Sequence, residues 1–166
     1  MGLDAQQFMS YAINPVLDKM TVTLKLPMNT IEAKQLLVGT FFSESHLKYL
    51  HQINGPALGL CQVEPATYID VCNYVRRKGS GFFEKVLYCI YGDHYRDFPS
   101  EDYLQTDLRL QVAIVRLIYW RVAQSIPETL SKQAEYYKTY FNTPLGKATV
   151  SHYLHAFPRE LNYQAG

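Results

Sequence analysis

The chain has 166 residues, a length typical of one compact domain. With 48% hydrophobic and 19% charged residues, its composition is globular and excludes an intrinsically disordered chain. A net charge of +1 provides no strong field to attract nucleic acid, and no apolar run reaches the length of a membrane span. We therefore expect neither a nucleic-acid partner nor membrane insertion.

The cysteines and histidines do not form a pattern of metal ligands. Cys61, Cys72 and Cys89 are odd in number and lack CxxC spacing, which predicts free, buried thiols made in a reducing compartment. The histidines include pairs such as His152 and His155, but no set of four ligands has the spacing of a zinc site. We expect no metal and no cofactor.

Residues 1–28 are expected to form an N-terminal helix followed by an extended lead-in. Residues 3–12 have the pattern of a short amphipathic helix, and the turn signal Asn14-Pro15 is predicted to end it. Residues 21–26 alternate between apolar and polar side chains, which is typical of a brief strand or an extended segment.

The most apolar helix of the chain is predicted next. Asn29 and Glu32 resemble a capping box, and the helix behind them runs from Thr30 to about Ser43. From Leu36 onward it is apolar around most of its circumference, which favours a central, buried helix.

The remaining chain predicts further helices joined by irregular loops. In order, we expect a loop over 51–63, a helix over 68–78 capped by Thr67, helices over 82–92, 101–124 and 127–141, a turn over 143–146 and a last helix over 148–157. About seven helices and almost no strand predict an all-α fold. We expect one structural domain, made of the 1–28 segment, a main part over 29–158 and a tail over 159–166.

One carboxylate has an unusual position, at the end of the most apolar helix. Glu44 follows Phe41, Phe42 and Ser43, so apolar neighbours desolvate it and the negative end of the helix dipole lies beside it. Both effects disfavour the charged form and predict a raised pKa. A glycosidase general acid needs this property. The alternative is that Glu44 simply turns outward to water.

The segment that follows contains two motifs. Glu44-Ser45 is followed by Gly59-Leu60-Cys61-Gln62-Val63-Glu64-Pro65-Ala66-Thr67. This pattern resembles the soluble lytic transglycosylase family of the lysozyme superfamily, in which Glu-Ser ends a buried helix and Gly-Leu-Met-Gln, an aliphatic residue, any residue, Pro, any residue and Thr follow. Cys61 replaces the Met; both side chains are soft and apolar.

The resemblance covers about residues 30–157. A third segment, Tyr136 to Gly146, is similar to the family's Tyr-Asn motif, but here Phe141 precedes Asn142 and carries no hydroxyl. The sequences of the segments GPALGLCQVEPAT and FNTPLGKATV are most similar to those of small transglycosylase-like proteins encoded by phages and prophages. The loss of that hydroxyl predicts either reduced activity or a hydroxyl supplied from elsewhere.

The resemblance implies a lysozyme-like domain that cleaves the β-1,4 bond between N-acetylmuramic acid and N-acetylglucosamine in peptidoglycan. Glu44 would be the one acid/base, and attack by the sugar's own C6 hydroxyl would leave a 1,6-anhydro end. If water attacked instead, a second carboxylate would be needed. Its candidates are Glu64, Asp70, Glu101 and Asp102.

Supporting side chains follow from the same motifs. We expect substrate contacts from Ser45, Gly59, Leu60, Gln62, Tyr140 and Asn142. Gln62 can donate to and accept from an amide-bearing sugar, and Gly59 permits a close approach of the backbone. Structural roles stay open for these residues, such as a turn glycine, a loop amide or an Asn helix cap.

Two other functions remain open at this stage. A virion structural or assembly protein would keep the lysozyme-like fold with weak or lost activity, and Phe141 and Cys61 favour it. A wall-binding module would use the tyrosine-rich surface. The N-terminus has no signal-peptide pattern, so we expect synthesis in the host cytoplasm and either a place in the virion or delivery to the periplasm and cell wall. The partners expected are glycan strands and, in a particle, other virion proteins.

Overall fold

The computed structural model describes residues 2–143 and 145–162, which are mainly helical. The α-helices are α1 (Ala5–Phe8), α2 (Asn14–Leu24), α3 (Ile31–Ser45), α4 (Pro65–Arg77), α5 (Ser80–Tyr91), α6 (Leu108–Trp120), α7 (Leu130–Tyr137) and α8 (Val150–Ala156). Two π-helical turns, η1 (Met9–Ile13) and η4 (Lys138–Asn142), and three 3-10 turns, η2 (Gly92–His94), η3 (Glu101–Gln105) and η5 (Arg159–Leu161), complete the order. Within the described residues only isolated bridges replace strands, so the all-α prediction is confirmed.

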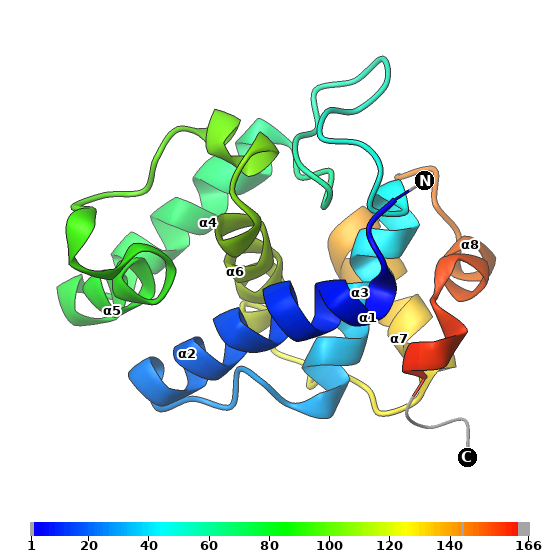
Figure 1. Cartoon of the computed structure of the whole chain (residues 1–166), viewed down its shortest axis with the longest axis horizontal. Helices are drawn as coiled ribbons and strands as arrows, with labels where there is room; N and C mark the ends of the chain where they lie inside the picture. Colours follow the sequence, from blue (N-terminus) through cyan, green and yellow to red (C-terminus); the bar gives the residue numbers. More distant parts are fainter. Residues whose placement is uncertain (1, 144, 163–166) are drawn as a thin grey trace.

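Helix α6 lies between two groups of helices. On one side α2, α4 and α5 pack together, and on the other side α3 packs with α7 and α8 (Figure 1). One hydrophobic cluster runs through both groups, and it includes residues from Ala5 near the start of the chain to Leu161 near its end. The N-terminal segment and residues of the predicted tail therefore share the core of the main part. No helix within the described residues is long and apolar enough to cross a membrane.

The first helical segment is longer than predicted, because the Asn14-Pro15 pair does not end it. The turn η1 (Met9–Ile13) widens the helix just before the proline, and Asn14 N–H donates to the Met9 carbonyl, five residues back. Pro15 then lies in the first turn of α2, where its missing N–H costs least. The prediction that the helix ends at Asn14-Pro15 was wrong.

The segment 21–26 is not a strand or an extended lead-in. Its first four residues continue α2, which ends when Lys25 adopts a left-handed conformation with φ of 57°. Leu24 lies one helical turn after the buried Met20 and packs into the core with it, whereas Val22 faces outward. The alternation of apolar and polar residues over 21–26 therefore did not predict the backbone here, because residues 21–24 continue the preceding helix.

Helix α3 has its expected central position but a different N-cap. The Thr30 hydroxyl accepts a hydrogen bond from Ala33 N–H at 3.2 Å, whereas the Asn29 amide donates to Asp18. The predicted Asn29 capping box is therefore wrong by one residue. Helix α3 is buried on nearly all sides, and Gly39 allows the Tyr153 ring of α8 to lie directly against its backbone.

Three later boundaries also differ from prediction. Thr67 lies inside α4, which begins at Pro65, because proline suits the first turn of a helix. The predicted helix over 101–124 is two elements, η3 and α6, because the Asp107 carboxylate accepts from two backbone N–H groups and caps α6. The predicted helix over 127–141 begins only at Leu130 and changes to the π-helical turn η4.

The loop and turn predictions agree with the structure. Residues 51–63 form an irregular loop with two isolated bridges. Gly146 N–H donates to the Thr143 carbonyl at 3.1 Å, which closes the predicted turn; Pro144 lies outside the described residues. The last helix, predicted over 148–157, is α8.

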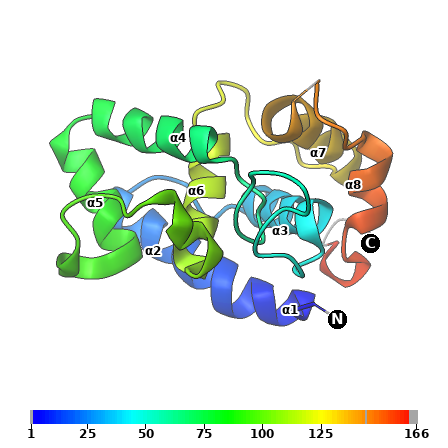
Figure 2. The same cartoon turned by 90° about the horizontal axis from the view of Figure 1, so that it is seen from above.

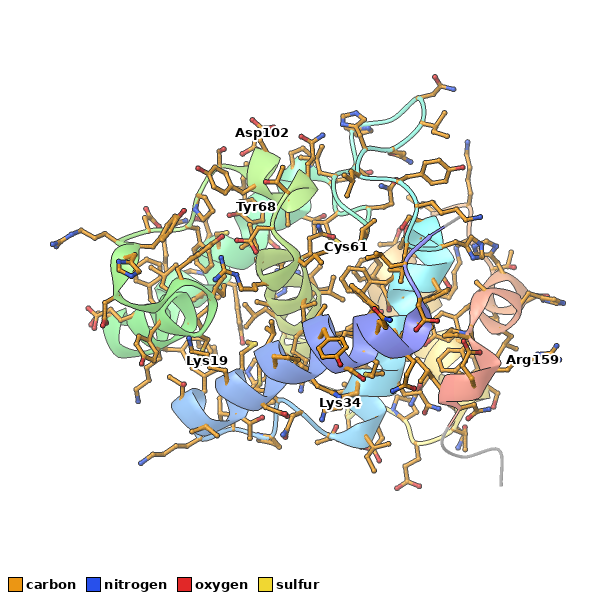
Figure 3. All side chains as sticks on the ribbon, viewed as in Figure 1. Lys19, Lys34, Cys61, Tyr68, Asp102 and Arg159 are labelled. Carbon is orange, nitrogen blue, oxygen red and sulfur yellow. The ribbon has the colours of Figure 1, made fainter. Side chains whose placement is uncertain are left out.

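The cysteines are free and buried, as predicted. Cys61 lies near the centre of the molecule, at the base of the loop that follows α3 (Figure 3). The tyrosines divide between core and surface. Tyr119, Tyr137 and Tyr153 are among the largest fully buried side chains, whereas Tyr11 and Tyr49 are exposed. The tyrosines therefore serve the core as well as the surface, and they do not all form one tyrosine-rich surface.

Candidate active site

A cavity of about 650 Å³ opens where α3 ends. Its walls come from the end of α3, the loop before α4, the first turns of α4, and the segment from Tyr137 to Ala148. Figure 2 shows α4 and α7 on the same side of the molecule, with α6 between them. The cavity is large enough for part of a sugar chain, since ligand pockets commonly measure about 300–1,000 Å³.

Glu44 lies in this cavity, in the last turn of α3. The helix ends because His46 and Leu47 both adopt left-handed conformations, with φ of 49° and 55°. His46 N–H closes the last turn by donating to the Phe42 carbonyl at 3.0 Å. The chain thus turns away directly after the carboxylate, which leaves Glu44 partly exposed to the cavity rather than fully exposed at the surface.

The Glu44 carboxylate has one hydrogen-bond partner at short range. The Tyr137 hydroxyl of α7 donates to Glu44 Oε1 at 2.6 Å. Tyr137 is itself fully buried, stacked on Phe141 with ring centroids 5.9 Å apart and packed against Tyr153 at 5.0 Å. Aromatic neighbours on two sides therefore fix the donor, and the donor in turn fixes the carboxylate.

Burial raises the pKa of Glu44 from 4.5 to about 7, and the hydrogen bond from Tyr137 opposes part of that rise. Desolvation dominates because the charged carboxylate loses more hydration in this cavity than one hydrogen bond returns. The carbonyl end of α3 acts in the same direction as desolvation. Near neutral pH the group is therefore divided between its protonated and charged forms, as the sequence predicted in direction.

Three of the residues expected to contact substrate line the cavity. They are Gln62, Tyr140 and Asn142. Gln62 Nε2 donates to the Gly59 carbonyl at 2.8 Å, and the Asn142 Oδ1 accepts from Lys138 Nζ at 2.9 Å. These bonds hold both amides at the cavity wall. The Asn142 side chain also hydrogen-bonds Tyr137, the residue that donates to Glu44.

The other three expected residues have structural contacts and are not part of the cavity wall. The Ser45 hydroxyl is buried and donates to the Leu60 carbonyl at 2.7 Å, which ties the end of α3 to the loop. Leu60 is a core side chain. Gly59 has φ of 73°, and a side chain there would collide with the Leu104 carbonyl and with Gln111. None of these three residues is part of the cavity lining.

Two cavity groups were missed by the sequence analysis. Tyr137 is one, although its signal was present: it lies four residues before Phe141, so the two side chains share one face of the helix. Ser43 is the other; its hydroxyl is buried beside Glu44 without a hydrogen-bond partner among the described residues. A hydroxyl does reach Glu44, but it comes from α7 one turn before Phe141.

The candidate second carboxylates fall into two groups. Glu64 and Asp70 line the cavity, and Asp70 pairs with Arg121 at 2.5 Å. Glu101 and Asp102 are not part of its wall, and Asp102 lies on the outer side of η3 (Figure 3). Of the four candidates for a second carboxylate, Glu64 and Asp70 therefore remain.

Cys61, the third residue of the Gly59-Leu60-Cys61-Gln62 segment, is a core side chain and does not line the cavity. It is fully buried, and burial raises the pKa of its thiol to about 12. At neutral pH it is therefore an uncharged core side chain and not a nucleophile. The charged groups that do line the cavity include Arg121 and Lys147 as well as the three carboxylates Glu44, Glu64 and Asp70.

Comparison of the chain with protein-family models, with curated proteins and with solved structures found no match.

Proposed function

We propose that this protein is a phage- or prophage-encoded enzyme with a lysozyme-like fold that cleaves the β-1,4 bond between N-acetylmuramic acid and N-acetylglucosamine in peptidoglycan. The observation that carries the proposal is Glu44, a carboxyl group with a pKa of about 7 in a cavity of about 650 Å³. Such a group holds a proton near neutral pH and still gives it up readily, as a general acid must.

The reaction proposed is that of a lytic transglycosylase. Protonated Glu44 donates its proton to the glycosidic oxygen, and the bond to C1 of the muramyl sugar breaks. The Glu44 carboxylate then takes the proton of the C6 hydroxyl of the same sugar, whose oxygen bonds to C1 and closes the 1,6-anhydro ring. Because the nucleophile belongs to the substrate, its effective concentration is high and no water is consumed. Glu44 finishes the cycle protonated.

Tyr137 supports both halves of this cycle as a positioning residue. Its hydrogen bond favours the charged form of Glu44, so it limits the rise in pKa that burial produces. Without that limit, Glu44 would be a weaker acid in the first step. Gln62 and Asn142 line the cavity, and in this proposal their amides bind amide and hydroxyl groups of the sugars.

The test is digestion of purified sacculi, with the released muropeptides identified by mass spectrometry. We expect the unmodified protein to release anhydro-muramyl ends and Glu44→Gln to release none. Glu64→Gln is the matched control, because it makes the same chemical change to another carboxylate of the same cavity; it should retain activity.

The other outcomes have definite meanings. Reducing ends in place of anhydro ends would make the protein a hydrolase, and the loss of activity in Glu64→Gln or Asp70→Asn would identify its second carboxylate. If folded protein released nothing, the proposal would be wrong. Binding to sacculi without cleavage would then indicate a wall-binding module, and the absence of both would favour a virion structural or assembly protein.

A further inference from the structure

A second cavity of about 400 Å³ lies on another face of the molecule. It is lined by the start of α3, the end of α6, the segment 122–126 and Tyr136 of α7. Tyr136 and Tyr137 are neighbours in sequence, yet Tyr136 lines this cavity and Tyr137 lines the first one. One helix therefore separates the two cavities.

The wall of the second cavity contains a buried cation. Arg116 is only 3% exposed, and its Nε and Nη2 donate to the carbonyls of Met28 and Pro27 at 2.8 and 3.3 Å. A guanidinium has five N–H donors, and three of those of Arg116 have no hydrogen-bond partner among the described residues. Among the described residues no carboxylate lies within ion-pair distance of Arg116.

A buried charge without a counter-charge is costly. Burial lowers the pKa of Arg116 to about 10, which still leaves the group charged at neutral pH. Two carbonyl contacts do not neutralise that charge, and proteins usually pair or hydrate such groups. Arg116 is part of the wall of an open cavity, so an anion that entered the cavity would meet a charge already stripped of most of its water.

The other residues of the cavity wall indicate which kind of anion fits. The Arg116 guanidinium lies over the ring of Trp120, 5.3 Å from its centroid, so an apolar or aromatic surface adjoins the cation. Glu32 also lines the cavity. Its negative charge disfavours a doubly charged ligand more than a singly charged one. The planar fork of Arg116 matches the two oxygens of a carboxylate.

We propose that this cavity is a second ligand site, separate from Glu44, which binds a small monocarboxylate with an apolar or aromatic body, its two oxygens on Arg116 and its body against Trp120.

The experiment uses the fact that Trp120 is the only tryptophan of the chain. Its fluorescence is titrated with benzoate and, in parallel, with benzamide, which has nearly the same shape without the charge. We expect a saturable response to benzoate and none to benzamide. Inorganic phosphate should bind more weakly than benzoate because Glu32 repels its second charge. A linear response to benzoate, equal binding of benzamide, or tighter binding of phosphate would each overturn the proposal.

Variants test the two charges separately. Glu32→Gln should tighten benzoate binding several-fold, and Arg116→Met should abolish it. If Arg116→Met does not fold, Arg116→Lys keeps the charge but loses the fork, and it should weaken binding about tenfold. Unchanged affinity in Glu32→Gln together with unchanged affinity in either Arg116 variant would refute the assignment. Glu44→Gln should bind benzoate normally, so this test is independent of whether the protein cleaves glycan strands.

Discussion

Two opposing effects set the pKa of a single side chain, Glu44. Burial favours the neutral carboxyl, and the hydroxyl of Tyr137 favours the carboxylate. The balance gives a pKa of about 7, and the hydrogen bond keeps it below the value that burial alone would produce. A general acid and base that acts in both directions near neutral pH needs such a balance.

Removal of the Tyr137 hydroxyl should shift that balance upward. In Tyr137→Phe the charged form of Glu44 loses its donor, so the pKa of Glu44 should rise above about 7. NMR titration of the Glu44 side-chain carboxyl carbon measures this directly, without any need for activity. Tyr140→Phe is the control, since Tyr140 lines the cavity but has no hydrogen bond to Glu44 among the described contacts. An unchanged Glu44 pKa in Tyr137→Phe would contradict this account of the site.

The raised pKa of Glu44 also has a consequence for stability. Between pH 4.5 and about 7 the folded protein binds more protons at Glu44 than the unfolded chain does, so this carboxyl lowers stability as pH rises through that range. Glu44→Gln does not titrate. Its free energy of unfolding, relative to the unmodified protein, should therefore increase from pH 4.5 to 7 by up to about 3 kcal/mol. Chemical denaturation at a series of pH values measures the difference; a constant difference would show that Glu44 titrates normally.

At the scale of elements, helix type and order could be predicted far better than helix ends. The apolar run from Leu36 marked α3 as central, because only a buried helix is apolar on nearly every side. The break between η3 and α6 was missed because Asp107 is a cap that only the folded backbone identifies. The residues at the site were harder still. Tyr137 lies 93 residues after Glu44, and its spacing from Phe141 indicates only that the two rings share a helix face, not that α7 packs on α3.

The contact between α3 and α8 depends on the missing side chain of Gly39. A methyl group there would collide with the Tyr153 ring, so Gly39→Ala should lower the free energy of unfolding by about 1–3 kcal/mol. Gly81→Ala is a matched control within a helix, because a side chain at Gly81 would meet open space. It should raise stability by about 0.5–1 kcal/mol, since alanine favours the helix. Urea denaturation measures both; a stable Gly39→Ala would show that the two helices can separate at little cost.

On the scale of the whole molecule, the N-terminal helices are part of the one core. Leu17 in α2 is completely buried, and Leu17→Ala should lower the free energy of unfolding by about 2–5 kcal/mol. The single unfolding transition should shift as a unit, because no second core exists among the described residues to unfold separately. Val22→Ala, at a position that is 78% exposed on the same helix, should change stability little. Two separate transitions in calorimetry would instead indicate an independent N-terminal unit.

The stacking of Tyr137 on Phe141 also suggests how such a site can change during descent. Both rings line the same cavity, lie one helical turn apart and stack on each other. Under the proposed function, a chain with tyrosine at both positions could lose the hydroxyl at 141 by a single substitution and keep the one at 137. A hydroxyl would still reach Glu44, although its position along the chain had moved by one helical turn.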